Sequence, residues 1–175
     1  MAKVFTIINN KGGTGKTTTV LNLGAALARK KRKVLLIDLD SQCNLTSALG
    51  IESTSKGIGD LLLGNCPINA TIIKNGGIDA IPSTEKLLDI EFQLNNEPGR
   101  EYMLKEQIEK VQDVYDFILI DCPPSLNTLS TNSLVAAQYF IVPMQAENFA
   151  FIGLDRIMLI SEKVKKRLNP SLEIA

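Results

Sequence analysis

A glycine-rich stretch with two lysines is the feature that most constrains the fold of this chain. Residues 10–17 are Asn-Lys-Gly-Gly-Thr-Gly-Lys-Thr; they follow an apolar run at Val4–Ile8 and run into a helical pattern from Lys16 to about Arg29. A strand, a glycine-rich loop and a helix in this order are the setting of a phosphate-binding loop. The sequence therefore predicts an α/β fold with a site for a phosphorylated ligand.

The chemistry of the loop depends on its glycines and on its last residues. Glycines allow backbone N–H groups to turn inward and surround phosphate oxygens, and the start of the following helix adds its positive end. Lys16 can reach the β- and γ-phosphates of a nucleotide, and the Thr17 hydroxyl can ligate Mg²⁺. We therefore expect nucleotide binding by Lys11, Gly12, Gly13, Thr14, Gly15, Lys16, Thr17 and Thr18.

Apolar runs alternate with helical patterns along the whole chain. Further strands are predicted at Val34–Ile37, Ile78–Ile81, Phe117–Ile120 and Tyr139–Val142, and one begins at Leu172–Ala175. Helices are predicted at Ile58–Leu63, from a Ser83 cap toward Leu94, from near Gly99 through Leu104, Ile108, Val111 and Tyr115, and at Thr128–Ala137 and Gly153–Leu168. This alternation predicts three layers, with a mainly parallel twisted sheet and helices on both faces. No linker or repeat divides residues 1–175, so we expect a single domain.

Carboxylates follow two of the predicted strands. Asp121 ends the run at Phe117–Ile120, while Asp38 and Asp40 end the run at Val34–Ile37. Acidic residues at strand ends are often only turn formers. Beside a phosphate loop they become candidates for holding hydrated Mg²⁺, because Mg²⁺ prefers oxygen ligands and keeps several waters.

The loop and three later segments resemble the deviant Walker ATPases. The segments are the loop Lys11–Thr18, Leu36–Gln42, the Walker B-like run Phe117–Pro124, and the stretch from Ile141 to Leu154. Among these ATPases, the chain is most similar to the ParA/Soj-type partition proteins, ahead of MinD-type cell-division regulators and the nitrogenase iron protein. Two departures stand out: Asn10 replaces the first glycine of the strict loop pattern, and Ser41 replaces a proline.

The resemblance implies roles for individual residues. ATP with Mg²⁺ would be the ligand, Lys16 and Asp40 would be catalytic, and Asp40 would orient the attacking water. Thr17, Asp121 and Asp38 would serve the metal, with Asp38 supporting the loop or the metal shell. Lys11 would be catalytic across an ATP-dependent homodimer. The segment Pro123–Ser125 would be a switch that senses the γ-phosphate.

The resemblance also implies a biological setting. The protein would be a slowly hydrolysing ATP switch for chromosome or plasmid partition, located in the cytoplasm and associated with the nucleoid. Its partners would be a ParB-like DNA-binding protein and, in the full-length family form, nonspecific DNA. The C-terminal part of the family domain would be absent, so we expect the sheet edge at Leu172–Ala175 to be either exposed or paired with another molecule.

Composition excludes several other classes of protein and leaves some questions open. There is no histidine, the formal net charge is zero, and the three cysteines (Cys43, Cys66 and Cys122) suit neither a disulfide framework nor a zinc site. No apolar run approaches the ~18 residues of a membrane span, so no membrane contact is expected. The basic runs Arg29–Lys33 and Lys163–Arg167 are either solvated helix ends or nucleic-acid contacts.

Three other functions remain open from the sequence. One is a MinD-type regulator that cycles on the membrane. Another is a nonhydrolytic module in which ATP only controls assembly. The third is a biosynthetic ligase that shares the fold, against which Lys11 argues.

Overall fold

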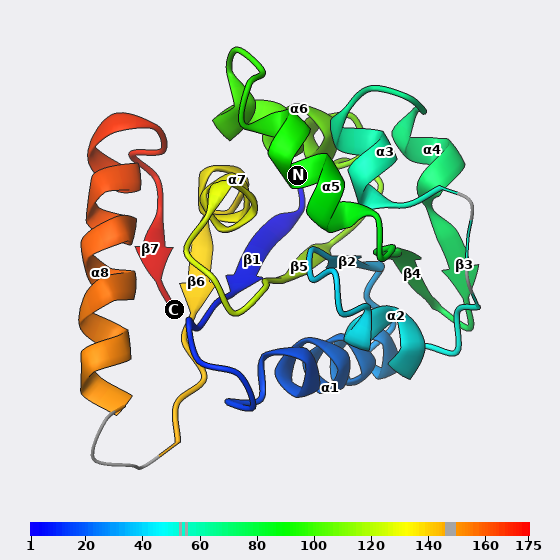
Figure 1. Cartoon of the computed structure of the whole chain (residues 1–175). Helices are drawn as coiled ribbons and strands as arrows, with labels where there is room; N and C mark the ends of the chain where they lie inside the picture. The colour runs from blue at the N-terminus through cyan, green and yellow to red at the C-terminus, as the bar shows by residue number, and fades with distance from the viewer. Residues whose placement is uncertain (53, 55, 146–149) are drawn as a thin grey trace.

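A parallel sheet forms the centre of the protein, as the computed structural model in Figure 1 shows. The structure describes residues 1–52, 54, 56–145 and 150–175, with only the backbone at 150–152. Within these residues one seven-stranded sheet has the order β3-β4-β2-β5-β1-β6-β7, and its pairs are parallel except for β3 with β4. The strands are β1 (Lys3–Ile7), β2 (Val34–Asp38), β3 (Ile73–Asn75), β4 (Ile78–Ile81), β5 (Phe117–Asp121), β6 (Tyr139–Ile141) and β7 (Glu173–Ile174).

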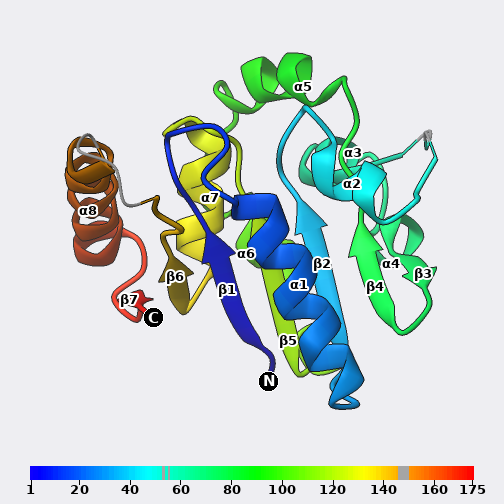
Figure 2. The same ribbon diagram turned by 90° about the horizontal axis from the view of Figure 1, so that it is seen from below.

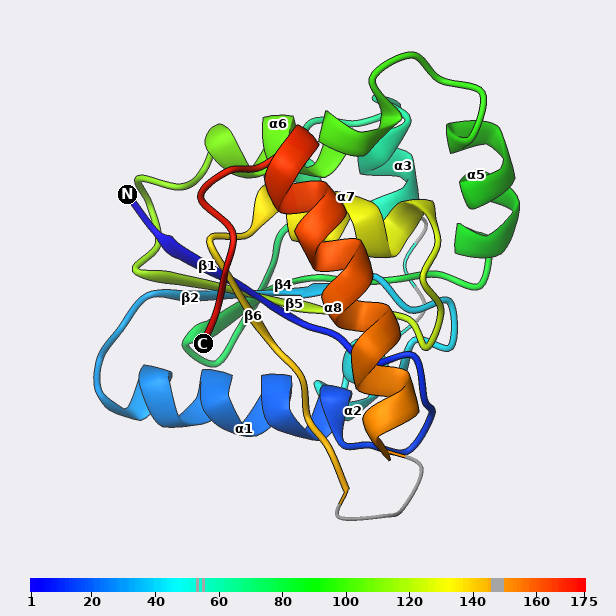
Figure 3. The same ribbon diagram turned by 90° about the vertical axis from the view of Figure 1, so that its left-hand side faces the viewer.

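Helices cover both faces of the sheet. One face carries α1 (Lys16–Arg29), which lies along β1, β5 and β2 in Figure 2, and the short α2 (Asn44–Ala48). The other face carries α3 (Ile58–Leu62), α5 (Leu87–Leu94), α6 (Met103–Glu109) and α7 (Thr128–Ala136), with α4 (Ile68–Thr71) beside α3. Helix α8 (Ala150–Arg167) packs against α7 at the end of the sheet (Figure 3). The predicted three-layer architecture is therefore confirmed.

Strand β2 shows why the sheet needs both helical layers. All five of its residues are buried. Val34 and Leu36 pack in the same apolar cluster as Val20 of α1, while Leu35 and Ile37 belong to the larger cluster on the opposite face. Successive side chains of a strand point to opposite faces, so an unbroken apolar run is stable only between two layers.

Several predicted elements are right in kind and differ in their ends. The bounds of α1 and β4 agree with the prediction, whereas α8 begins at Ala150, three residues before the predicted start at Gly153. The helix expected from Gly99 opens as a 3₁₀ turn at Arg100–Tyr102, and α6 ends at Glu109. Its last predicted members, Val111 and Tyr115, are buried in a turn, where the Val111 N–H donates to the Ile108 carbonyl.

The predicted cap at Ser83 is wrong. Helix α5 begins only at Leu87, after Lys86 in the cap position. Ser83 is buried, and its backbone N–H donates to the Thr46 hydroxyl at 3.0 Å. Ser83 therefore ties the loop after β4 to α2, an element that the sequence analysis had missed.

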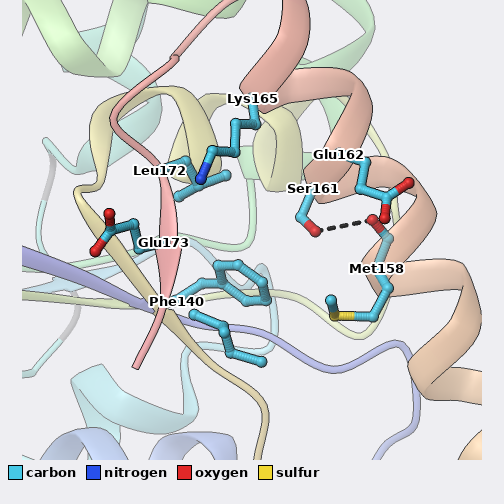
Figure 4. Close-up of a pocket in the computed structure, with 8 residues that line it drawn as sticks. Phe140, Met158, Ser161, Glu162, Lys165, Leu172 and Glu173 are labelled. Carbon is cyan, nitrogen blue, oxygen red and sulfur yellow. Dashed lines mark hydrogen bonds between the residues drawn. The ribbon is translucent and has the colours of Figure 1, made fainter.

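The C-terminal strand lies at an open edge of the sheet. β7 pairs with β6, and both of its residues are exposed, in line with the expected edge. A groove of about 370 Å³ runs between β6, β7 and α8 (Figure 4). The Ser161 hydroxyl in this groove donates back to the Met158 carbonyl of its own helix at 2.9 Å. The groove is lined by Phe140, Met158, Ser161, Glu162, Lys165, Leu172, Glu173 and Ile174.

Candidate nucleotide site

Adjacent strands bring the predicted site residues to one edge of the sheet. β5 lies between β2 and β1, and the register places Asp121 beside both Asp38 and Ile7. The glycine-rich loop follows β1, so it starts at the same carboxyl edge where the two aspartates end their strands. Ligands of open α/β sheets bind at this edge.

The loop is closed by contacts to its own backbone. The Lys11 carbonyl accepts hydrogen bonds from the Lys16 ammonium at 3.2 Å and from the Thr14 hydroxyl at 3.4 Å. Gly13 and Gly15 have φ angles of 74° and 92°, in the left-handed region that favours glycine. The sequence Gly-Thr-Gly is thus required by the curvature of the loop.

The start of α1 is open to an anion. Among the described residues no side chain caps this helix, its first turn has no acidic residue, and its first backbone bond runs from the Thr19 N–H to the Gly15 carbonyl at 2.8 Å. The N–H groups of Lys16, Thr17 and Thr18 therefore precede the hydrogen-bonded part of the helix, where they can bind phosphate.

A cavity of about 530 Å³ connects the loop to the segment after β2. Of the predicted residues, it is lined by Gly12, Gly13, Gly15, Lys16, Thr17, Thr18 and Asp40. Gln42 and Asn44 also line it, and the sequence analysis gave neither of them a role. Pro124 completes the lining, so the proposed switch segment after Asp121 reaches the same space. Lys11 and Thr14 belong to the loop but lie outside this lining.

Asp121 is a buried acid whose oxygens are available. It is 1% exposed, and among the described residues neither carboxylate oxygen has a hydrogen-bond partner within 3.5 Å. Burial raises the pKa of Asp121 to about 7; Thr17 and Lys16 oppose the rise, and Asp38 adds to it. Unpartnered carboxylate oxygens near a threonine hydroxyl fit a hydrated Mg²⁺, which takes one or two protein ligands beside water and phosphate.

Both carboxylate oxygens of Asp38 accept hydrogen bonds from residues that follow β2. One carboxylate oxygen accepts the Asp40 N–H at 3.0 Å, and the other accepts the Thr46 N–H at 2.9 Å and the Thr46 hydroxyl at 2.7 Å. Burial raises the pKa of Asp38 despite these bonds. These contacts hold the segment after β2, whereas support of the phosphate loop or of the metal shell by Asp38 stays a prediction.

Asp40 is held at the wall of the cavity by a tight turn. One of its carboxylate oxygens accepts the Gln42 N–H at 3.0 Å, and its carbonyl accepts the Cys43 N–H at 3.0 Å. Cys43 has a φ of 53°, which is uncommon for a residue with a side chain. The turn forms with Ser41 in the place of the family's proline, and it leaves Asp40 as a whole 7% exposed.

The remaining sequence signals contribute little to the site. Cys122 is buried between the Thr6 and Ser133 hydroxyls, Cys66 is buried, and Cys43 is half-buried. Arg29–Lys33 are all exposed, so both interpretations of that run stay open. The family-like stretch from Ile141 to Leu154 is described except at residues 146–149.

Comparisons with known proteins agree with this geometry. A family model described as an AAA domain matches residues 2–174. The chromosome partitioning protein ParA of Caulobacter vibrioides is 43% identical over 178 residues, covering 98% of this chain and 67% of that protein. The chromosome-partitioning ATPase Soj of Treponema pallidum is 42% identical over 176 residues, covering 99% and 69%.

This chain belongs to the ParA/Soj family of P-loop ATPases. The family resemblance of the loop, the two aspartate motifs and the later segment is thereby confirmed. A solved structure from Mycobacterium smegmatis, described as cobyrinic acid a,c-diamide synthase with a bound ATP analogue and magnesium, matches this ParA/Soj-family chain with a TM-score of 0.96 and 37% identity. The match covers 99% of this chain and 72% of that one. In the described parts of the ParA/Soj-family chain, no helix is both long and apolar enough to cross a membrane.

Proposed function

We propose that this protein is a molecular switch that binds ATP with Mg²⁺ and hydrolyses it slowly to ADP and phosphate. In its ATP state it forms a homodimer that drives the partition of a chromosome or plasmid. One observation carries the proposal: a single cavity is lined by the phosphate-loop residues Lys16 and Thr17 and by the carboxylate-bearing Asp40. Relatives named as partition ATPases support the same function.

The loop binds the phosphates of ATP through backbone N–H groups and one ammonium. The first N–H groups of α1 contact the phosphate oxygens, with the positive end of the helix behind them. The Lys16 ammonium leaves its bond to the Lys11 carbonyl and contacts the β- and γ-phosphates. A buried ammonium in a narrow cavity stabilises the charge that develops as the terminal bond breaks.

Thr17 and Asp121 are the residues that would hold Mg²⁺. When bound, Mg²⁺ neutralises phosphate charge and orients the β- and γ-phosphates. The Thr17 hydroxyl would be a direct ligand, and the unpartnered oxygens of Asp121 would bind its water shell. Asp38 is paired with Asp121 in the sheet register, and its carboxylate oxygens accept hydrogen bonds from Asp40 and Thr46.

Asp40 is the residue that orients the attacking water. A carboxylate at the cavity wall accepts a hydrogen bond from that water and aligns it with the terminal phosphorus. The turn at Ser41–Cys43 fixes the carboxylate in place before ATP arrives. Preorganisation of this kind reduces the entropic part of the barrier.

Lys11 gives the switch its dependence on a second subunit. It lies on the exposed part of the loop, outside the cavity lining, and this position supports a role of its ammonium at the phosphates of the partner subunit's ATP. A cation supplied across a dimer stabilises transferred phosphoryl charge as an arginine finger does. ATP then links the two subunits, and ADP does not.

The wider role follows from the family. A ParB-like DNA-binding protein would stimulate hydrolysis, and the longer family form would bind DNA nonspecifically, in the cytoplasm and on the nucleoid. The name of the matched Mycobacterium smegmatis structure suggests a second candidate, an ATP-dependent amide-forming ligase. A ligase releases phosphate only with its acid substrate and a nitrogen donor, whereas a partition switch needs water alone.

Phosphate release is the experiment that tests the proposal. Purified protein with Mg²⁺ and ATP alone should release phosphate, and Asp40→Ala should lower the rate by at least about 100-fold while Mg-ATP affinity stays within about threefold. No release by the wild-type chain would favour the nonhydrolytic module. Equal release by both proteins would remove Asp40 from the mechanism.

A further inference from the structure

In the connection from β6 to α8, the described residues 142–145 form one wall of the phosphate loop. β6 lies beside β1, and the Ile8 N–H continues the pairing by donating to the Ile141 carbonyl at 3.0 Å. The amide nitrogen of the buried Asn9 side chain donates to the Pro143 carbonyl at 2.7 Å, and its oxygen accepts the Lys11 N–H at 3.0 Å. The first turn of the loop is therefore attached to a segment distant in sequence.

The same connection also reaches the far side of the loop. The side-chain amide of Gln145 donates to the Gly13 carbonyl at 3.1 Å. Gly13 is one of the left-handed residues that give the loop its curvature. The wall thus contacts the loop at its beginning and at its bend.

A third contact joins Asn10 to the first part of α8. A Cβ atom built on Gly153 would lie 2.7 Å from the Asn10 side-chain oxygen, closer than Cβ atoms approach other atoms in real structures. The next nearest atoms, at 3.7 and 3.8 Å, also belong to the Asn10 side chain. That buried oxygen has no hydrogen-bond partner among the described residues, and Asn10 stands where the strict loop pattern has glycine.

We propose that Gly153 is a positioning residue for the phosphate loop, acting through Asn10. Because Gly153 has no side chain, it leaves the space that Asn10 fills, and the backbone of Lys11–Gly15 keeps its nucleotide-binding curvature. Glycine is unfavourable inside a helix, so a packing requirement explains its presence in α8. The inference rests on the proposed binding of ATP, and it assigns Gly153 no contact with the nucleotide.

A double-mutant cycle tests this coupling. Mg-ATP affinity is measured by calorimetry for the wild type, Gly153→Ala, Asn10→Ala and the double variant. Gly153→Ala should weaken binding about tenfold, because the new Cβ displaces Asn10 and the loop with it. In the Asn10→Ala background the same substitution should change affinity less than about twofold, because the three atoms nearest to the new Cβ have been removed.

The intrinsic helix propensity of alanine predicts a more stable α8, which is the opposite of the expected loss of affinity, so the two effects can be told apart. Alanine favours helix over glycine, so a purely local effect of Gly153→Ala would stabilise α8. Lys163→Ala, at an exposed position of the same helix, is the matched control and should leave affinity unchanged.

Each result of the cycle has a definite meaning. An equal loss of affinity in both backgrounds, or no loss from Gly153→Ala, would overturn the inference while leaving the proposed function intact. A wild-type chain that does not bind Mg-ATP would overturn the proposed function and the inference with it. If Gly153→Ala is too unstable to titrate, folding that is recovered in the double variant supports the coupling, and equal instability of both contradicts it.

Discussion

The carboxylate of Asp38 accepts the backbone N–H of Asp40 at 3.0 Å, so a buried acid fixes the position of the acid that lines the cavity. The same carboxylate binds the N–H and the hydroxyl of Thr46, whose hydroxyl oxygen in turn accepts the Ser83 N–H. Asp38 therefore connects the turn at Asp40–Cys43, the first turn of α2 and the loop after β4.

Replacing Asp38 should damage both stability and catalysis. Asp38→Ala leaves the Asp40 and Thr46 donors unsatisfied, and each buried donor without a partner costs about 1–3 kcal/mol. We expect the free energy of unfolding in urea to fall by about 2–4 kcal/mol and phosphate release to slow, because Asp40 loses its anchor. The exposed Asp155→Ala serves as the control. A stable variant with normal turnover would show that Asp38 positions nothing.

The Thr17 hydroxyl should matter only when magnesium is present. Thr17→Val keeps the shape of the side chain and removes the oxygen. We expect Mg-ATP affinity to fall about tenfold, while ATP affinity measured in EDTA stays unchanged, since the loop still binds the phosphates. Calorimetry under the two conditions separates these effects. An equal loss with and without Mg²⁺ would indicate a distorted loop rather than a lost ligand.

The raised pKa of Asp121 predicts a particular pH dependence of stability. In the folded protein the pKa of Asp121 is about 7, against an ordinary value of 3.8, so between these pH values the folded state binds more protons than the unfolded state. Stability of the ligand-free protein should therefore fall as pH rises from about 4 to about 7, and the full difference corresponds to about 4 kcal/mol. The raised pKa of Asp38 acts in the same direction.

Asp121→Asn isolates the contribution of this acid. The variant cannot ionise at this position, so its unfolding free energy should vary less over the same pH range, with the contributions of Asp38 and Glu91 still present. Denaturant titrations at several pH values measure both curves. Identical slopes for the two proteins would mean that Asp121 titrates at its ordinary pKa.

Strong local signals in the sequence explain why much of the fold could be predicted. The β-branched runs, the Gly-Thr-Gly turn and the apolar period of Lys16–Arg29 each have one favourable conformation, and they produced the expected strand, loop and helix. The same logic placed Asp38 and Asp121 at strand ends, where the sheet register brings them side by side.

The missed features depend on contacts between distant segments. Helix α2 is only five residues long and has no side-chain cap among the described residues. Its first turn is held by the Thr46 N–H, which donates to the Asp38 carboxylate. Ser83 fits a helix-capping pattern, but α5 begins only at Leu87, and the Ser83 N–H donates to the distant Thr46 hydroxyl. Gln42 and Asn44 line the cavity because the turn at Cys43 directs the chain there, and a single left-handed residue of this kind has no sequence signature.

ATP-dependent dimerisation is the central claim, and light scattering on the Asp40→Ala variant tests it most directly, because blocked hydrolysis preserves the ATP state. The variant should have the mass of two chains with Mg-ATP and of one chain with Mg-ADP, and adding Lys11→Ala should reduce the mass with Mg-ATP to one chain. The same mass with either nucleotide, in a protein that calorimetry shows to bind both, would contradict the account.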